Sequence, residues 1–445
     1  MPQPTRIDAD VAVIGAGGAG LYTALTAAER GATVALISAT PLAQTASYWA
    51  QGGIAAALAQ DDSPDEHLRD TETAGRGLTR PSAARTLVAE APDAVRHLEQ
   101  LGVRFDADRH GNPALGLEGG HSKRRVVHAG GSATGRRVVR ELSALAVEHE
   151  RITVLDAARA ADLWCRDGRV VGVLIEDGRA VAASATIISA GGAAALWSRT
   201  TNPPGSTGAG MVLAHRAGAQ LADLEFLQFH PTAVTGIPRR EGFLITEAIR
   251  GEGATLHGPD GERFVEELAP RDEVAMAIHD KRRQTGATHV GLDMRAVDPS
   301  LFPNVVKALR DSGLDPKAEL IPVAPAAHYM MGGVVTDLHG RSTVGGLYAV
   351  GESACTGLHG ANRLASNSLS ECLVCGARAA TAATEDPDAR TTADPPAPQP
   401  VPPPSDATKD AMWRDAGLER TTEGLERLTD DAHPLARLVA SCALA

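Results

Sequence analysis

The first forty residues combine short apolar runs with one glycine-rich turn. Ile7–Ile14 predicts a buried strand, the Ala-rich run Leu21–Arg30 predicts a helix, and Ala32–Ile37 predicts a second strand. The turn between the first strand and the helix is Gly15, Ala16, Gly17, Gly18, Ala19 and Gly20. A strand, glycine-rich turn and helix in this order are typical of a βαβ unit whose backbone closes on a pyrophosphate at the helix N-terminus. We therefore predict a dinucleotide site at this turn.

The tip of the second predicted strand bears on which dinucleotide is bound. An acid at this position usually contacts the ribose hydroxyls of NAD, and an Arg accommodates the additional phosphate of NADP. The tip here is Ser38-Ala39. Both nicotinamide interpretations are therefore weakened, and Ser38 is the candidate contact to the cofactor.

The pattern between residues 83 and 190 predicts two helices followed by several strands. Helical periodicity covers residues 83–101 and 134–150. Residues 152–181 are rich in β-forming side chains and are divided by two Asp-Gly pairs, which is typical of hairpins. A further apolar strand, 185–190, ends in a pair of glycines.

A change of character in the middle of the chain predicts an inserted domain. An apolar strand with glycine ends returns at 346–352, whereas residues 240–320 carry more charge and helices bounded by Pro. A later segment rich in Pro, Asp, Ala and Thr reads as an extended linker. The predicted parts are a discontinuous nucleotide-binding domain (1–239 and 321–385), an inserted domain (240–320), a linker (386–405) and a short helical region (406–445).

Composition and charge exclude several classes of protein. The 445 residues are 43% hydrophobic and 22% charged, which is ordinary for a soluble globular protein. A formal net charge of −12 opposes a large phosphate-binding surface, so we expect no nucleic-acid partner. The N-terminus carries acids where a signal peptide is apolar, and no later run is long and apolar enough to cross a bilayer. We expect a cytoplasmic protein without a membrane partner.

The five cysteines do not form a disulfide framework in a chain of this length. Cys372 and Cys375 have the spacing of a redox motif, but they lie in an apolar run that predicts a packed helix. We predict no metal site.

Small residues at 46–53 follow the nucleotide-binding unit, and their glycine pair lets backbone approach a flat ring system. Together with the first turn, Ser189-Ala190-Gly191-Gly192 and 346–352, this segment resembles the FAD-dependent fumarate reductase and succinate dehydrogenase flavoprotein superfamily, and within it the L-aspartate oxidases. The resemblance spans about residues 7–380. Its most specific stretches are 118–122, 128–135, 228–232, 244–253 and 357–369.

The resemblance implies an α/β fold: a Rossmann-like FAD-binding domain, an inserted α+β capping domain and a short C-terminal helical region. It implies oxidation of L-aspartate to iminoaspartate, the first step of de novo NAD biosynthesis, with oxygen (giving hydrogen peroxide) or fumarate as electron acceptor. A soluble fumarate reductase and a catalytically weak flavin-binding protein are the alternatives. Direct transfer of the product to quinolinate synthase is left open.

Within this superfamily the membrane enzymes attach FAD covalently through a His five residues before the Gln or Glu of the 46–53 loop. Ala46 stands at that position, so the expected FAD is noncovalent. Ala209 replaces an Asp usual in the family and removes one expected hydrogen bond to the cofactor. By resemblance, the contacts beyond the first turn are Ala46, Ser47, Tyr48, Trp49, Ala50, Gln51, Gly52, Gly53, Glu352, Ser368 and Leu369.

A four-carbon dicarboxylate needs cationic donors at both ends, because desolvated carboxylates require charge-assisted hydrogen bonds. By resemblance, His230 and Thr246 bind one carboxylate, and His328 with Arg363 binds the other. The ammonium group of aspartate also needs an anionic partner if it is desolvated. The resemblance and this requirement assign that role to Glu118.

Arg271 stands at the start of a predicted helix, where a cation opposes the helix dipole and a purely structural role gives little reason for one. In the superfamily this Arg transfers a proton opposite the flavin, relayed through residues that match Glu247 and Arg250. These two are three positions apart and would share a helix face. Because arginine is normally charged, the role requires that burial and neighbouring cations make its proton labile.

Overall fold

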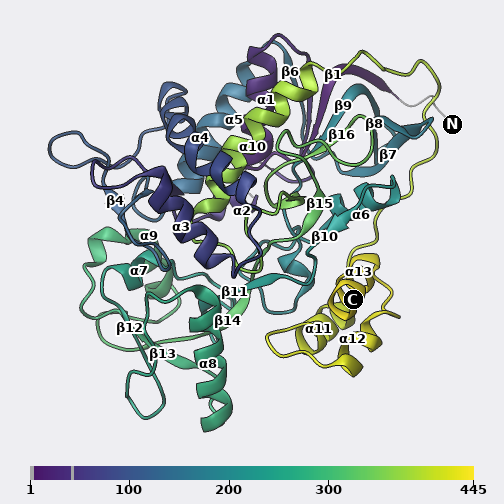
Figure 1. Cartoon of the computed structure of the whole chain (residues 1–445). Coiled ribbons are helices and arrows are strands. Elements are labelled where there is room, and N and C mark those ends of the chain that lie inside the picture. The colour runs from purple at the N-terminus through teal and green to yellow at the C-terminus, as the bar shows by residue number, and fades with distance from the viewer. Residues whose placement is uncertain (1–4, 42–44) are drawn as a thin grey trace.

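The computed structural model describes residues 5–41 and 45–445. The predicted N-terminal βαβ unit forms part of a seven-stranded sheet (Figure 1). Its path is β6-β2-β1-β9-β8-β7, with β16 also paired to β9. The strands are β1 (Arg6–Ile14), β2 (Val34–Ile37), β6 (Ile152–Leu155), β7 (Ala160–Arg166), β8 (Arg169–Ile175), β9 (Ala180–Ile188) and β16 (Leu347–Ala349). β6, β2, β1, β9 and β16 are parallel, and β7 and β8 are antiparallel. The βαβ start and the hairpins are thereby confirmed.

Strand β9 explains how two distant segments reach one sheet. Its first residues pair with β8, and Thr186–Ile188 pair with Leu347–Ala349 of β16. All of β9 is buried, as expected for a strand covered on both faces. Residues 185–188 of the strand predicted at 185–190 form the end of this longer strand, and residues 189 and 190 lie beyond it.

Helices cover one face of the sheet, and α1, α5, α4 and α10 lie together in Figure 1. Their bounds are α1 (Gly18–Glu29), α3 (Pro64–Ala74), α4 (Pro81–Gln100), α5 (Thr134–Glu148) and α10 (Asn367–Thr384). α1 begins three residues earlier than predicted, because Gly17 serves as its N-cap within the turn. A Cβ at Gly376 would lie 2.8 Å from Oγ1 of Thr23, so small residues let α10 pack closely on α1. Cys372 and Cys375 are free thiols on α10, as the helical interpretation expected.

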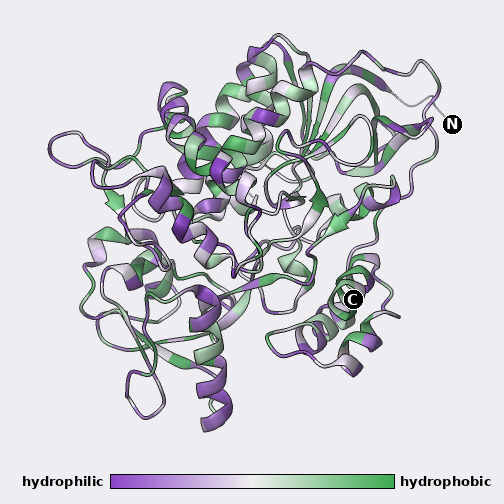
Figure 2. Ribbon diagram, viewed as in Figure 1, coloured by the Kyte–Doolittle hydropathy of each residue, from purple (hydrophilic) through white to green (hydrophobic). Residues whose placement is uncertain are grey.

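A second, antiparallel sheet with the order β11-β14-β13-β12 lies below the first in Figure 1. Its strands are β11 (Leu227–Val234), β12 (Thr255–His257), β13 (Val290–Asp293) and β14 (Ile321–Met330), and its helices are α7 (Ala248–Gly251), α8 (Arg271–Thr285) and α9 (Pro303–Arg310). Ile249, Leu292 and Ile321 belong to its own buried core. β11 and β14 flank the segment 240–320 in sequence, so the sheet crosses both predicted boundaries, and the domain division stays a prediction. Much of α8 is hydrophilic, as Figure 2 shows.

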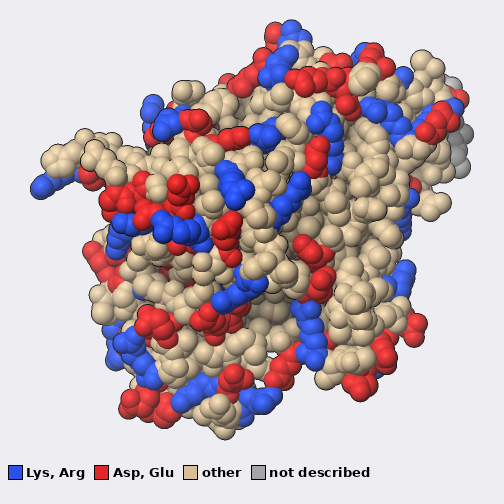
Figure 3. Space-filling view, viewed as in Figure 1, with Lys and Arg blue, Asp and Glu red and all other residues tan. Residues whose placement is uncertain are grey.

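Short elements join these layers. They are α2 (Ala46–Trp49), β3 (Ile54–Ala55), β4 (Leu115–Gly116), β5 (Val126–Val127), α6 (Ala209–Arg216), β10 (Leu221–Ala222), β15 (Gly333–Val335), β17 (Ala354–Cys355), η2 (Ala194–Leu196), η3 (Pro299–Leu301) and η4 (Gly351–Ser353). None of the helices in the described ranges has the length and apolar content needed to cross a bilayer. On the face in Figure 3, basic and acidic side chains are interspersed.

Three C-terminal helices follow a segment without regular structure, in which Asp386 accepts a 3.1 Å hydrogen bond from Arg169. They are α11 (Asp406–Asp415), α12 (Thr422–Leu428) and α13 (Pro434–Leu444). Nε1 of Trp197 donates to the carbonyl of Ala416 at 2.9 Å, which ties these helices to η2. The predicted fold class is confirmed, including the C-terminal helical region.

Candidate active site

The first turn has the conformation and the crowding that require glycine. Gly15 has φ +108°, and a Cβ there would overlap the carbonyl oxygen of Ser189. A Cβ at Gly20 would overlap the carbonyl oxygen of Gly15. α1 starts at this turn with Gly17 as N-cap, with no side-chain cap and no acid in its first turn. The turn therefore fits the pyrophosphate of FAD, whose charge would meet the positive end of α1.

α2 lies directly beside this turn. A Cβ at Gly17 would be 3.2 Å from Oγ of Ser47, and one at Gly18 would be 3.9 Å from Cδ2 of Leu369. Ser47 and Leu369 thus border the glycine turn, as a cofactor contact requires. Trp49, by contrast, is 56% exposed.

Ser38 and Glu352 mark two further edges of the predicted cofactor site. Ser38 is buried at the end of β2, and its hydroxyl donates to the carbonyl of Thr40 at 2.6 Å. Oε1 of Glu352 accepts from the backbone N–H of Met330 at 3.0 Å. Burial raises the pKa of Glu352 to about 7. Contacts of Ser38 and Glu352 with FAD stay predictions.

Gln51 connects the cofactor loop to the segment before α7. Its Nε2 donates to the carbonyl of Leu244 at 2.7 Å, and its Oε1 accepts from the backbone N–H of Thr246 at 3.3 Å. Gly53 has a packing role, since a Cβ there would overlap β5 at Val127. The side-chain amide of Gln51 therefore helps to place Thr246, a predicted substrate contact.

Glu118 is buried, and one of its two carboxylate oxygens has no hydrogen-bond partner among the described residues. Glu118 is 1% exposed, and its Oε2 accepts a hydrogen bond from the hydroxyl of Ser366 at 2.6 Å. Oε1 is buried and has no hydrogen-bond partner among the described residues. Buried polar atoms are nearly always hydrogen-bonded, and an exception calls for a missing partner such as a ligand. Gly52 leaves space here, since a Cβ at that position would be 3.3 Å from Oε1.

The three predicted catalytic residues form one buried ion cluster. Glu247 Oε2 accepts from Nε of Arg271 at 2.6 Å, and Oε1 accepts from Nη2 of Arg250 at 2.9 Å. Arg250 also donates to the carbonyl of Glu267. Burial alone would raise the pKa of Glu247, but the two guanidinium groups hold that pKa below its usual value. Burial lowers the pKa of Arg250.

Gln228 joins Arg271 to Arg363, and the sequence reasoning did not assign it to the site. Its Oε1 accepts from Nη1 of Arg271 at 3.1 Å and from Nη2 of Arg363 at 3.0 Å. Its Nε2 donates to Oδ1 of Asn362 at 2.8 Å and to the carbonyl of Arg363 at 2.7 Å. Gln228 could have been predicted from the sequence, because it lies two residues before His230 and alternate side chains of a strand share a face.

Arg363 lies over an aromatic ring. Its guanidinium lies 4.3 Å from the ring centroid of Tyr329, and Nη1 donates to the hydroxyl of Ser368 at 2.8 Å. Its Nε is buried without a partner in the described part of the chain. Burial, together with the charge of Arg271, lowers the pKa of Arg363 to about 10. Ser368, which is predicted to contact FAD, thus accepts a hydrogen bond from Arg363, which is predicted to bind the substrate.

The two candidate histidines face each other with ring centroids 5.0 Å apart. Nδ1 of His230 accepts from the backbone N–H of Thr232 at 3.3 Å, and its Nε2 has no partner within the described ranges. Nδ1 of His328 lies 2.7 Å from the hydroxyl of Thr201. Burial and the nearby arginines hold both pKa values well below the usual range, so both rings are neutral. We infer that His230 carries its proton on Nε2, where it is a free donor.

The predicted substrate and catalytic residues therefore come together from separate segments of the chain. Arg271, Glu247 and Arg250 come from the segment 240–320, and His230 and His328 come from the two strands that flank it. Glu118 and Arg363 come from the FAD-binding part and lie close enough to influence each other electrostatically. The cluster combines several cationic groups with one unsatisfied carboxylate oxygen, which suits a dicarboxylate that also carries an ammonium.

Comparison with known proteins agrees with this geometry. The FAD binding domain family model matches residues 10–369. L-Aspartate oxidase of Streptomyces coelicolor is 45% identical over 96% of this chain and 80% of its own length, and that of Nostoc sp. is 48% identical over 83% and 67%. A solved E. coli quinol fumarate reductase structure covers 99% of this chain and 90% of its own chain, with 27% identity and a TM-score of 0.88. With FAD as its cofactor, the chain belongs to the L-aspartate oxidase family.

Proposed function

We propose that this chain oxidises L-aspartate to iminoaspartate in NAD biosynthesis, with noncovalently bound FAD and with oxygen or fumarate as electron acceptor. One observation carries the choice of substrate: the buried, unpartnered Oε1 of Glu118 beside a cluster of arginines and histidines. Succinate and fumarate offer no cation to that oxygen. The ammonium of aspartate supplies one.

The chain's own groups offer hydrogen-bond donors to both carboxylates of the substrate. Arg363 and His328 bind one carboxylate, and His230, donating from Nε2, binds the other with Thr246. Charge-assisted hydrogen bonds of this kind are worth about 1.5 to 3 kcal/mol each. Bound FAD supplies the hydride acceptor for the α-hydrogen.

Two hydrogen bonds hold Arg271 in a position from which it can act at the reacting carbon of the substrate. Its Nε and Nη1 are used by Glu247 and Gln228, which leaves Nη2 to face the substrate. When fumarate is reduced, Arg271 delivers a proton, and Glu247 with Arg250 restores it.

The test is anaerobic titration of the holoenzyme with L-aspartate and, separately, with succinate. We expect L-aspartate to bleach the flavin absorbance, because both carboxylates and the ammonium find partners, and succinate to leave most of the colour. Bleaching by succinate alone favours a fumarate reductase. A flavin that neither compound bleaches indicates a flavin-binding protein without this activity.

Noncovalent FAD gives a second prediction, since Ala46 offers no nucleophile for attachment. Acid precipitation of the purified protein is expected to leave the yellow chromophore in the supernatant. The control is free FAD mixed with a precipitated colourless protein, which measures trapping. Colour that stays in the pellet beyond this control contradicts the proposal.

Direct transfer of iminoaspartate to quinolinate synthase and a cytoplasmic location remain predictions. Neither is required by the contacts described above.

A further inference from the structure

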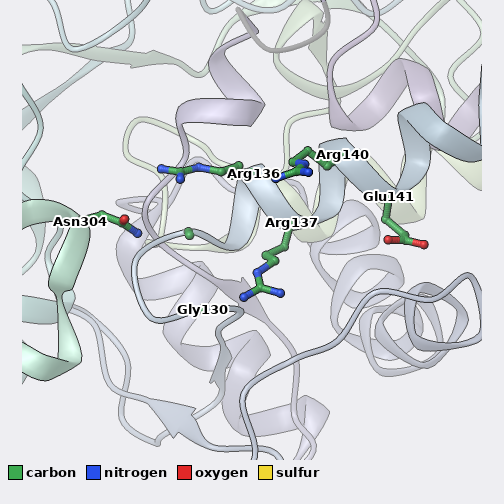
Figure 4. A pocket seen from close by; sticks show the side chains of 7 residues that line it. Gly130, Arg136, Arg137, Arg140, Glu141 and Asn304 are labelled. Atoms are coloured by element: carbon green, nitrogen blue, oxygen red, sulfur yellow. The ribbon is translucent and has the colours of Figure 1, made fainter.

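A cavity of about 540 Å³ lies between the FAD-binding part and the inserted segment. Arg136, Arg137 and Arg140 of α5 line it, with Asn304 of α9 across from them (Figure 4). Figure 4 shows Arg136 extending toward Asn304. None of the residues assigned above to substrate binding or catalysis lines this cavity.

Two of the three arginines are placed where a helix alone would not favour them. α5 begins at Thr134, so Arg136 and Arg137 lie in its first turn, which contains no acid. Cations there oppose the helix dipole. No carboxylate of the described residues forms an ion pair with any of the three guanidinium groups, although the protein as a whole is acidic. Glu141 is the acid that lines the cavity, so the lining keeps an excess of positive charge.

A second helix N-terminus borders the same cavity. α9 begins at Pro303, immediately before Asn304, with no side-chain cap and no acid in its first turn. The wall between α5 and α9 is fixed, because the backbone N–H groups of Gly130 and Gly131 each donate to Asp106 at 2.8 Å. Two uncapped helix N-termini and three guanidinium groups, of which Arg137 and Arg140 are exposed, thus border one space, an arrangement that attracts anions.

The cavity is separate from the pyrophosphate turn. Ser47 of α2 lies between them. Its Oγ borders Gly17 of the turn, and its carbonyl oxygen packs against Gly135 of α5, where a Cβ would overlap it. Arg136 lies 5.9 Å from the ring centroid of Tyr48 on the α5 side of α2. An anion in the arginine cavity therefore does not compete for the glycine turn.

We propose that this cavity binds a small anion carrying two or more phosphate groups, which bridges α5 and α9. Planar guanidinium groups match phosphate oxygens in pairs, and the volume exceeds the requirement of a single phosphate. Because Asn304 belongs to the inserted segment, the bound anion also holds that segment against the FAD-binding part. The inference does not depend on which substrate is oxidised.

Inorganic pyrophosphate is the probe, titrated calorimetrically into the holoenzyme at constant ionic strength, with inorganic phosphate and sulfate as comparison ions. We expect saturable binding of pyrophosphate, and binding at least about tenfold weaker in the double variant Arg137→Gln/Arg140→Gln. Arg85→Gln/Arg96→Gln is the matched control, because it removes the same number of charges from two exposed arginines of α4. FAD content is measured alongside.

Several results would overturn the proposal. Pyrophosphate that displaces FAD binds at the glycine turn instead. An affinity that the double variant leaves unchanged shows that these arginines do not bind the ion, and one that Arg85→Gln/Arg96→Gln lowers equally shows a general charge effect. Equal affinity for sulfate and pyrophosphate shows an adventitious ion only. Slower hydrogen exchange in residues 303–310 with pyrophosphate supports the bridge to α9, and unchanged exchange there contradicts it.

Discussion

Replacing Glu118 with Gln is expected to lower kcat/KM for L-aspartate by about 30- to 1000-fold, or about 2 to 4 kcal/mol. The substitution keeps the size of the side chain and an oxygen for Ser366, but it removes the charge at the unpartnered Oε1. The substrate ammonium is then left unpaired in a desolvated site. Fumarate has no ammonium and brings two negative charges, so its reduction is expected to be retained or faster.

The measurement is kcat/KM for both substrates in wild type and variant, at one pH and one salt concentration, with FAD content checked. Glu148→Gln is the matched control, since Glu148 is exposed near the end of α5. If both activities fall together in Glu118→Gln, the carboxylate is structural or serves any dicarboxylate. The choice of aspartate then loses its main physical support.

Local motifs made the cofactor and the fold class predictable from the sequence. Gly20 is required by its contact with Gly15 in the same turn, and Gly15 by the positive φ of that turn, so the local spacing already carries much of the constraint. The contact of Gly15 with Ser189 is an additional, long-range requirement. The hairpins between β7, β8 and β9 likewise depend on short turns. Features of this kind are encoded within about thirty residues, and sequence alone was sufficient for them.

Features that depend on distant pairing were not predictable in the same way. Gln228 acts through Arg271, 43 residues away, and Arg363, 135 residues away. The inserted sheet takes β11 and β14 from outside the segment whose composition changes, because strand pairing does not follow composition. The arginines of α5 share a cavity with Asn304 of α9, which is far from them in the sequence. Contacts between residues that are far apart in the sequence become visible only in the tertiary structure.

Glu247→Gln is expected to destabilise the protein by about 3 to 5 kcal/mol, because one carboxylate separates two buried guanidinium groups. Each of its oxygens accepts from a different arginine, and the amide of Gln would turn its NH2 toward one of them. Two buried cations would then face each other without a counter-charge.

The free energy of unfolding of the FAD-saturated protein measures this loss, and Glu273→Gln on α8 is the control. Glu273 pairs with Arg76 at the surface, where 52% of its side chain is exposed, so its loss is expected to cost less than about 1 kcal/mol. A cost for Glu247→Gln as small as the control would mean that the two arginines do not depend on this carboxylate. In that case Arg271 would have to be positioned by Gln228 alone, and a proton relay through Glu247 would no longer be supported.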